Sequence, residues 1–304
     1  MTSTTTDTPG PTGRFSIGGE LPVTRLGFGA MRLPTGPGPG REAAIAVARR
    51  AVDLGVTLID TAHLYGWGAN EELLAEALFP YPDDLLITTK VGVTRSGPEG
   101  WAYDGRPESL REQVEQGLRR LRTERVGLLQ LHRIDPAVPV AEQVGALSDL
   151  RREGKIGHIG LSEVTTAQLA EARRTAEIAS VQNRYNLLDR EYEPVLEACE
   201  AAGIAFLPWR PVAAASDAGR EAALDTVADL ATELGATTPQ VLLAWLLARS
   251  PVVLPIPGTA SISHLEQNVA AAGLRLTDSQ LRRLDRAAGS AQPRSEGPGA
   301  RPAP

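Results

Sequence analysis

The sequence predicts an α/β fold, a single (β/α)8 TIM barrel preceded by a short β-hairpin. Eight apolar runs of strand length alternate with longer stretches that have helical spacing. Together these pairs occupy about 260 residues, which is the usual number of units and the usual size of such a barrel. The eight runs are 26–30, 56–60, 85–89, 127–131, 156–160, 179–182, 204–208 and 252–256.

An open, doubly wound sheet is the competing arrangement. A sheet of that kind normally has a glycine-rich dinucleotide turn directly after its first strand. The corresponding segment, Gly27-Phe28-Gly29-Ala30, lacks the third glycine, and no helical pattern follows it directly. The sequence therefore favours the barrel.

The elements can be justified in chain order. Two short apolar segments, 15–17 and 21–23, flank Gly18-Gly19, which is typical of a β-hairpin. A helix is expected over 41–54, because apolar residues recur there at helical spacing. A second helix is expected over 107–122 for the same reason. It starts at Pro107, a residue that suits the first helical turn, and one face carries Leu110, Val114, Leu118 and Leu121.

Both ends of the chain are expected to be disordered. Residues 1–13 and 289–304 are rich in Pro, Gly, Ser and Thr and show no apolar periodicity. The predicted organisation is therefore one barrel domain over 14–288 between two disordered segments.

The composition excludes several classes of protein. No apolar run is long enough to cross a bilayer, and the N-terminal segment lacks the basic start and apolar core of a secretory signal. The single cysteine, Cys199, excludes an internal disulfide and fits a reducing cytoplasm. The net charge of −6 argues against nucleic acid as the main partner. We expect a cytoplasmic monomer or weak homo-oligomer that binds neither nucleic acid nor membranes.

Polar residues stand at the ends of three neighbouring predicted strands. Asp60, Lys90 and His132 each end an apolar run, and Tyr65 follows Asp60 after five residues. Active sites of such barrels form at the C-terminal ends of the strands, so these four side chains should meet at one mouth. Taken singly, each has an ordinary structural role: a turn cap, a loop aromatic, a buried histidine or a solvated strand end.

Lysine is scarce in this chain. Lys90 and Lys155 are the only lysines among 31 Lys and Arg residues, so a lysine retained at a strand end is notable. Unlike arginine, lysine has a compact ammonium group whose pKa moves readily on burial. Lys155 lies before the fifth predicted strand, and we expect it at the opposite end of the barrel from the chemistry.

The motifs around these residues resemble the aldo-keto reductase superfamily, and two further segments, Phe79-Pro-Tyr-Pro-Asp-Asp84 and Pro257-Gly-Thr259 with His264-Leu265, are similar to bacterial pyridoxal-reductase-like members. The resemblance runs from about residue 14 to 288. It is carried by Leu58-Ile-Asp-Thr-Ala-His-Leu-Tyr65-Gly66, Asn70-Glu-Glu-Leu-Leu74, Thr89-Lys90, Leu131-His132-Arg133, Gly160-Leu-Ser162, Val181-Gln182-Asn183-Arg-Tyr185-Asn186, Leu207-Pro-Trp209-Arg-Pro211 and Ile256-Pro-Gly-Thr259 with Asn268.

The resemblance implies that the protein reduces an aldehyde or ketone with Tyr65 as the general acid. An oxygen that gains negative charge needs a positioned proton donor, and a free tyrosine is a poor acid at neutral pH. Lys90 is expected to lower the pKa of Tyr65, and Asp60 to keep Lys90 charged. His132 is expected to donate a hydrogen bond to the substrate oxygen. His63 has no matching role, and loop packing is expected for it.

The resemblance also implies a nicotinamide cofactor and no metal. Ser162 and Gln182 are expected to hold the carboxamide, and Trp209 to stack on the nicotinamide ring. Helix N-termini bind phosphate through free N–H groups, and the predicted capping box of Ser263 and Glu266 starts such a helix. The phosphate contacts are therefore expected from the segment that contains Gly258, Thr259, His264, Gln267 and Asn268.

Two departures from the family pattern bear on the cofactor. Glu163 stands where the family commonly has Asn, and a carboxylate cannot donate a hydrogen bond as an amide does. Gly258 and His264 stand where NADPH-selective members often have Lys and Arg, and neutral histidine adds little charge. NADPH remains the expected cofactor, with NADH as the alternative.

Four apolar or aromatic residues lie on loops expected at the mouth of the barrel: Met31, Trp67, Trp101 and Tyr103. They favour a flat carbonyl compound, such as an aromatic aldehyde like pyridoxal or a secondary-metabolite carbonyl. Two other functions stay open: a cofactor-binding, redox-sensing regulatory subunit of the same fold, and a barrel isomerase or lyase without nicotinamide.

Overall fold

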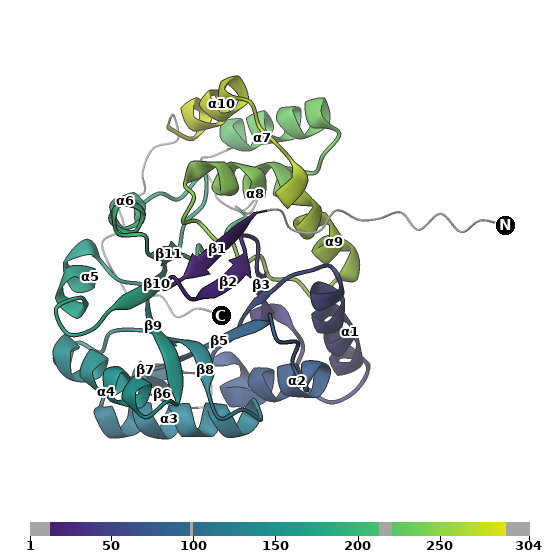
Figure 1. The fold of residues 1–304 in the computed structure, drawn as a ribbon. Helices are drawn as coiled ribbons and strands as arrows, with labels where there is room; N and C mark the ends of the chain where they lie inside the picture. Colours follow the sequence, from purple (N-terminus) through teal and green to yellow (C-terminus); the bar gives the residue numbers. More distant parts are fainter. Residues whose placement is uncertain (1–12, 98–99, 213–220, 290–304) are drawn as a thin grey trace.

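The computed structural model describes residues 13–97, 100–212 and 221–289. Strands and helices alternate along these residues, and seven parallel strands form one curled sheet in the order β11-β10-β9-β8-β5-β4-β3. The helices surround the sheet (Figure 1), so the predicted (β/α)8 architecture is confirmed. The strands are β3 (Phe28–Gly29), β4 (Leu58–Asp60), β5 (Leu86–Val91), β8 (Val126–Leu131), β9 (Ile156–Ser162), β10 (Ile178–Gln182) and β11 (Ala205–Phe206).

The helical segments follow the strands in chain order, and several begin with local sequence signals. Thr165 and Thr237 each form a capping box with the glutamine three residues later, and proline occupies the first turn of α1, α3, α6 and α8. The α-helices are α1 (Pro39–Asp53), α2 (Ala69–Leu78), α3 (Pro107–Arg120), α4 (Val140–Arg152), α5 (Thr166–Ala172), α6 (Glu193–Ala202), α7 (Glu221–Leu234), α8 (Thr238–Arg249), α9 (Ile262–Ala270) and α10 (Asp278–Gly289), and the short 3-10 segments are η1 (Ala30–Arg32), η2 (Tyr65–Gly68) and η3 (Ala271–Gly273).

The two helices expected from apolar spacing are both present. The first extends two residues further toward the N-terminus than predicted, because Pro39 and Gly40 join the first turn of α1. The second, α3, buries Leu110, Val114 and Leu118 as predicted, but it ends at Arg120 and leaves Leu121 as its C-cap.

The eighth predicted strand, 252–256, closes the barrel without forming a regular strand. Phe206 N donates to Val252 O at 2.8 Å, Leu254 N donates to Phe206 O at 2.8 Å, and Gly27 N donates to Pro255 O at 2.9 Å. This segment therefore bridges β11 and β3. Its ladder is incomplete because Pro255 and Pro257 have no N–H to donate.

The predicted hairpin is present as β1 (Arg14–Ile17) and β2 (Leu21–Thr24), paired antiparallel. It lies across one end of the barrel, at the centre of the view in Figure 1. Its Ile17 and Val23 pack with Leu58, Leu86 and Leu128 from inside the barrel. The hairpin thereby covers the N-terminal ends of the strands with an apolar floor.

Side chains along the strands alternate between the inside and the outside of the barrel. Leu58, Leu86 and Leu128 belong to the inner apolar cluster, whereas Ile59 and Leu129 belong to the larger cluster between the sheet and the helices. Because the side-chain period of a strand is two, Asp60 and Lys90 point inward above that floor. An apolar lower layer thus supports a polar upper layer at the C-terminal mouth.

A second hairpin, which the sequence did not predict, follows β5. It consists of β6 (Val93–Arg95) and β7 (Trp101–Tyr103), paired antiparallel.

The segments expected to be disordered, 1–13 and 289–304, lie outside the described residues except for Gly13 and Gly289. Within the described part of the chain, no helix has the length and hydropathy required to span a membrane.

Candidate active site

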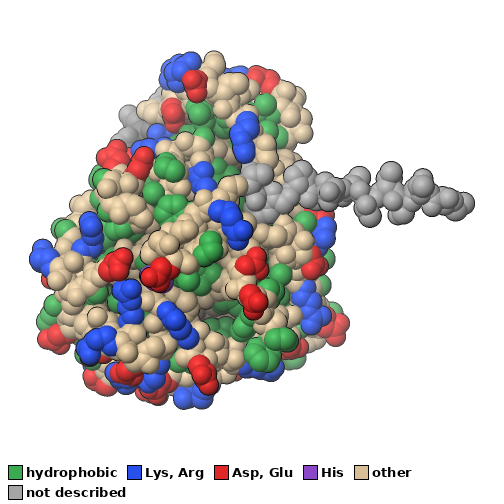
Figure 2. Space-filling model, in the orientation of Figure 1, with side chains coloured by type: hydrophobic (Ala, Val, Ile, Leu, Met, Phe, Trp, Pro, Cys, Tyr) green, Lys and Arg blue, Asp and Glu red, His purple; other side chains and the backbone are tan. Residues whose placement is uncertain are grey.

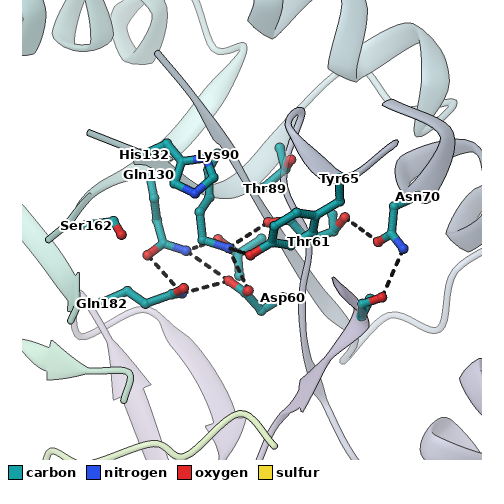
Figure 3. Close-up of polar contacts among 12 residues, drawn as sticks. Asp60, Thr61, Tyr65, Asn70, Thr89, Lys90, Gln130, His132, Ser162 and Gln182 are labelled. Carbon is teal, nitrogen blue, oxygen red and sulfur yellow. Dashed lines mark hydrogen bonds and ion pairs between the residues drawn. The ribbon is translucent and has the colours of Figure 1, made fainter. Parts of the chain in front are cut away.

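The Lys90 ammonium lies at the centre of the polar layer and is fully buried. Its Nζ donates to Asp60 Oδ2 at 2.6 Å, to the carbonyl oxygen of Thr61 at 2.9 Å and to Tyr65 Oη at 3.4 Å (Figure 3). Three acceptors match the three N–H groups of an ammonium. The structure therefore brings together Asp60, Tyr65 and Lys90, as predicted.

The Asp60 carboxylate is held from both sides. While Oδ2 accepts from Lys90, Oδ1 accepts from Gln182 Nε2 at 2.8 Å and from Gln130 Nε2 at 3.2 Å. Gln130 also donates to Thr88 Oγ1 at 3.1 Å. The carboxylate is thus fixed by side chains from three further strands, and one N–H of Gln182 is already used by Asp60.

The loop that carries Tyr65 is fixed by hydrogen bonds from its own neighbours. Thr61 Oγ1 donates to Asn70 Oδ1 at 2.6 Å, and Asn70 Nδ2 donates to Ala30 O at 2.9 Å. These bonds join the loop after β4 to the start of α2 and to the loop after β3 (Figure 3). Tyr65 is thereby presented at the mouth from a rigid base.

Burial and the neighbouring charges have opposing effects on the pKa values of Lys90 and Tyr65. Burial lowers the pKa of Lys90, but the Asp60 carboxylate and the Tyr65 hydroxyl more than compensate and raise it above its ordinary value. Burial also raises the pKa of Tyr65 above its ordinary value, although Lys90 opposes this. Burial of the phenol outweighs the ammonium charge, so the pKa of Tyr65 lies above its ordinary value even though Lys90 lowers it, as expected.

His132 lies beside Tyr65, with the two ring centroids 6.2 Å apart and the rings perpendicular. Burial first, and then the positive charges of Lys90 and Arg133, hold its pKa well below the ordinary value of a histidine. The imidazole is therefore neutral at neutral pH. Its Nδ1 is buried and has no hydrogen-bond partner among the described residues.

Arg133 is a second cation at the mouth that the sequence interpretation left without a role. Its Nη1 donates to His132 O at 2.7 Å and to Ser162 Oγ at 3.2 Å. Its guanidinium also lies 5.9 Å from the ring centroid of Trp101. Ser162 is therefore fixed next to His132 and keeps its own hydroxyl hydrogen to donate.

Glu163 holds the indole of Trp209. Its Oε1 accepts from Trp209 Nε1 at 2.6 Å and from the backbone N–H of Arg184 at 2.8 Å. The carboxylate is thus turned toward the loop after β11. The neighbouring Asn183 amide is used by the backbone of Val164, with hydrogen bonds of 3.1 and 2.7 Å.

The predicted phosphate segment lies against the loop after β3. A Cβ added to Gly258 would lie 2.7 Å from Gly29 O, and one added to Gly29 would lie 2.7 Å from Ile256 O. The two backbones approach so closely that a lysine at position 258 would require this loop to move. Glycine at position 258 therefore suits this close approach of the two backbones.

The predicted capping box of Ser263 and Glu266 is wrong. Helix α9 begins at Ile262, and its N-cap is Ser261, whose hydroxyl accepts from His264 N at 3.4 Å. Glu266 instead accepts from Arg50 of α1, with distances of 2.9 and 2.6 Å. The helix N-terminus nonetheless follows the buried Thr259, while His264 and Gln267 are exposed and Asn268 is buried.

The predicted pocket residues occupy separate loops. Trp67 lies in η2 at a φ of 56° and packs under Arg95 of β6, 4.9 Å from its ring centroid. Trp101 packs edge to face with Tyr103, at 5.4 Å between centroids, and its Nε1 is buried without a partner among the described residues. Met31 is 42% exposed.

A second buried polar network lies behind the wall of the barrel. Glu71 of α2 accepts from Thr89 Oγ1 at 2.6 Å and from Arg120 Nη1 at 3.1 Å, and the same Nη1 lies 3.1 Å from His63 Nδ1. Thr89 points outward because it alternates with Lys90. His63 thus belongs to the helix layer, in agreement with the expectation of loop packing.

Gln130 and Glu163 are the main residues that sequence interpretation did not assign to the site. A signal existed for Gln130, because it interrupts the apolar run Leu128 to Leu131 at an inward position. For Glu163 the sequence showed only the departure from Asn. Its partner Trp209 is far along the chain, so the contact required the folded barrel.

Comparisons with known proteins agree with this geometry. The model of the Aldo/keto reductase family matches residues 25–288. An uncharacterized oxidoreductase of Schizosaccharomyces pombe is 46% identical over 272 residues, covering 88% of this chain and 87% of that protein. Pyridoxine 4-dehydrogenase of Escherichia coli is 40% identical over 281 residues, covering 89% of this chain and 96% of that protein.

A solved structure extends the comparison to the fold. The aldo/keto reductase from Klebsiella pneumoniae in complex with NADP and acetate is 30% identical, with a TM-score of 0.78, and the match covers 90% of this chain and 94% of that one. Both the sequence model and the fold match span most of the barrel. This chain therefore belongs to the aldo-keto reductase family and is an NAD(P)H-dependent oxidoreductase.

Proposed function

We propose that this protein reduces an aldehyde or ketone to an alcohol with NADPH, and that Tyr65 donates the proton. The observation that carries the proposal is the fully buried Lys90 ammonium, which contacts Asp60 Oδ2 at 2.6 Å and Tyr65 Oη at 3.4 Å. A phenol beside a fixed ammonium is suited to give up a proton at a defined position.

The pKa directions are consistent with this role. Since burial raises the pKa of Tyr65, the phenol is protonated at neutral pH and its proton is available. The Lys90 charge then stabilises the phenolate that remains after transfer to the substrate oxygen. Neutral His132 donates an N–H to that same oxygen and orients the carbonyl.

The residues present fit a nicotinamide dinucleotide. The mouth offers the Ser162 hydroxyl and the Gln182 amide oxygen, both suited to the carboxamide, while Nε2 of Gln182 donates to Asp60 and Gln130. Trp209 is half-buried and offers a flat ring for stacking. The close backbones of Gly29 and Gly258 leave Thr259 and the N-terminus of α9 for phosphate groups. When bound, the cofactor supplies the hydride.

NADPH is the proposed cofactor, and NADH is the alternative. Support for NADPH comes from relatives of known structure, among them the Klebsiella pneumoniae reductase with NADP. In this chain the phosphate contacts would come from Thr259, backbone N–H groups and the side chains of His264, Gln267 and Asn268.

The proposed substrate is an aromatic aldehyde such as pyridoxal. Trp67, Trp101 and Tyr103 provide flat surfaces near the mouth, and Arg133 adds a fixed positive charge beside His132. The name of the Escherichia coli relative, pyridoxine 4-dehydrogenase, points to the same class of compound.

The Tyr65→Phe variant tests the proposal. We expect kcat to fall by about 10²- to 10⁴-fold, the usual contribution of a positioned acid, while the Kd for NADPH stays unchanged. Tyr81→Phe is the matched control, because the Tyr81 hydroxyl donates to Leu121 O at 2.7 Å, away from the mouth. Near-normal turnover by Tyr65→Phe would exclude Tyr65 as the acid.

The same assay separates the enzyme from a regulatory subunit. The purified wild-type protein should oxidise NADPH with a panel of aromatic aldehydes when no other protein is present. Binding of NADPH without turnover on any aldehyde or ketone would favour the regulatory subunit. Failure to bind either dinucleotide would contradict both functions.

A further inference from the structure

Glu163 adopts a backbone conformation that its side chain does not favour. It directly follows Ser162 at the end of β9, and its φ of 55° lies in the left-handed region. Asparagine tolerates that region better than glutamate does. A glutamate kept in this conformation therefore points to a role for its longer, charged side chain.

The contacts of the carboxylate indicate what that role is. Oε1 accepts two N–H groups, from the Trp209 indole at 2.6 Å and from the Arg184 backbone at 2.8 Å, and Oε2 lies 3.5 Å from the Tyr192 hydroxyl. An indole N–H can only donate, so the carboxylate fixes the direction of the Trp209 ring. The negative charge of Glu163 also affects Tyr192. Burial, and after it the charge of Glu163, raises the pKa of Tyr192 to about 12.

A carboxylate on the indole N–H changes the ring as well as its orientation. A hydrogen bond to an anionic acceptor polarises the donor, so the π face of Trp209 becomes more electron-rich. Such a face attracts a cation, and indole is the best of the aromatic side chains at this. The oxidised nicotinamide ring carries a positive charge, whereas the reduced ring is neutral.

We propose that Glu163 is a positioning residue that aligns Trp209 and makes its ring select the oxidised, positively charged nicotinamide over the reduced one. This inference rests on the proposed function, in which Trp209 stacks on the nicotinamide. By linkage, tighter binding of the oxidised form makes the bound reduced form a stronger hydride donor. Glu163 would thus favour carbonyl reduction without contacting the substrate.

Binding titrations of NADP⁺ and NADPH by calorimetry test the inference without any turnover. The measured quantity is the ratio of the Kd for NADP⁺ to the Kd for NADPH. Glu163→Gln keeps an acceptor oxygen but loses the charge, and we expect it to raise this ratio by about three- to tenfold, in line with the strength of cation–π contacts. Glu191→Gln removes an exposed charge next to Tyr192 and should leave the ratio unchanged.

Trp209→Phe tests whether the indole carries the effect. This variant keeps an aromatic ring but has no N–H to bind Glu163, so its ratio should also rise. In the double variant with Glu163→Gln, the second substitution should add little. If Glu163→Gln fails to give a folded protein by circular dichroism, Glu163→Asn takes its place, because asparagine tolerates the left-handed backbone and carries no charge.

Three results would overturn the inference. An equal loss of affinity for both forms in Glu163→Gln would leave Glu163 with an orienting role only. An undiminished effect of Glu163→Gln in the Trp209→Phe background would show that the charge does not act through the indole. An unchanged ratio in Trp209→Phe would exclude the ring. If the wild-type protein binds neither form, the proposed function fails instead.

Discussion

The two lysines lie at opposite ends of the barrel and have different surroundings. Lys90, near the C-terminal end of β5, is fully buried with one carboxylate, one carbonyl oxygen and one phenol around its Nζ. Lys155, just before β9, is half-buried and its Nζ lies 2.7 Å from Glu115 and 3.1 Å from Glu153. Positive and negative side chains are interspersed over the hairpin end of the molecule (Figure 2).

Both lysines have a raised pKa, but they differ in what surrounds their charge. The pKa of Lys155 is raised by the hydrogen bonds that it donates to Glu115 and Glu153, and the pKa of Lys90 is raised by Asp60 and Tyr65 against burial. Water screens the charges of Lys155 and its two glutamates, so these ion pairs contribute little to stability. Lys90 and its partners are shielded from water, so no water molecule can replace a partner that is lost. The same residue type thus serves as a surface charge at one end and as the centre of a reactive site at the other.

The largest expected effect is that of Lys90→Arg, which keeps the charge. A planar guanidinium does not fit three acceptors arranged around one nitrogen in a closely packed layer. We expect kcat/KM to fall by about 10²- to 10⁴-fold. Lys90→Met, which keeps the length of the side chain without its charge, is the control for packing. Wild-type turnover by Lys90→Arg would contradict the assignment of Lys90.

The next effect concerns the floor of the barrel. A Cβ at Gly18 would lie 2.4 Å from His158 Nδ1, and the φ of Gly18 is 61°. We expect Gly18→Ala to lower the free energy of unfolding by about 1–3 kcal/mol in a urea titration. The value of kcat/KM should not change at a temperature where the variant is folded. A loss of turnover without a loss of stability would contradict the view that the hairpin floor only supports the fold while the mouth carries the chemistry.

The stability is also expected to depend on pH. Burial first, and then nearby arginines, lower the pKa of His63 to about 4, and the pKa of His132 is also held well below its ordinary value. As the pH falls below 6.5, the two histidines become protonated in the unfolded chain, whereas in the folded protein they stay neutral to a lower pH. Stability should therefore decrease from pH 6.5 to about 4, by at most about 1.4 kcal/mol per pH unit for each histidine.

The histidine contribution can be isolated by comparing the wild type with His63→Gln. Urea titrations at several pH values should give a shallower dependence in the variant over the same window, since one such histidine is removed. An identical dependence in the two proteins would mean that His63 does not titrate with a lowered pKa.

The smallest effect is expected for Lys155→Ala. Because both of its ion pairs are open to water and screened by it, the free energy of unfolding should change little, and kcat/KM should not change. A marked loss of turnover in this variant would remove the distinction between the two lysines on which the comparison rests.

Much of the fold and of the site could be predicted from the sequence. Apolar runs and helical spacing are local patterns, and they gave the barrel, the hairpin and the strand ends that carry Asp60, Lys90 and His132. Seven of the eight expected strands are regular strands. The eighth is irregular because Pro255 and Pro257 interrupt its hydrogen bonding. Both prolines are visible in the sequence, but the apolar pattern of residues 252–256 led to the prediction of a regular strand.

The sequence by itself determined which residues reach the mouth, because the direction of a side chain on a strand follows from its place in a two-residue period. Only the tertiary structure decided what those residues bind. Gln182 donates to Asp60 across 122 residues, and Glu163 reaches Trp209 across 46. The pKa of Tyr65 likewise depends on how deeply the folded chain buries the phenol. Such partners and such burial come from closure of the barrel, which no local pattern encodes.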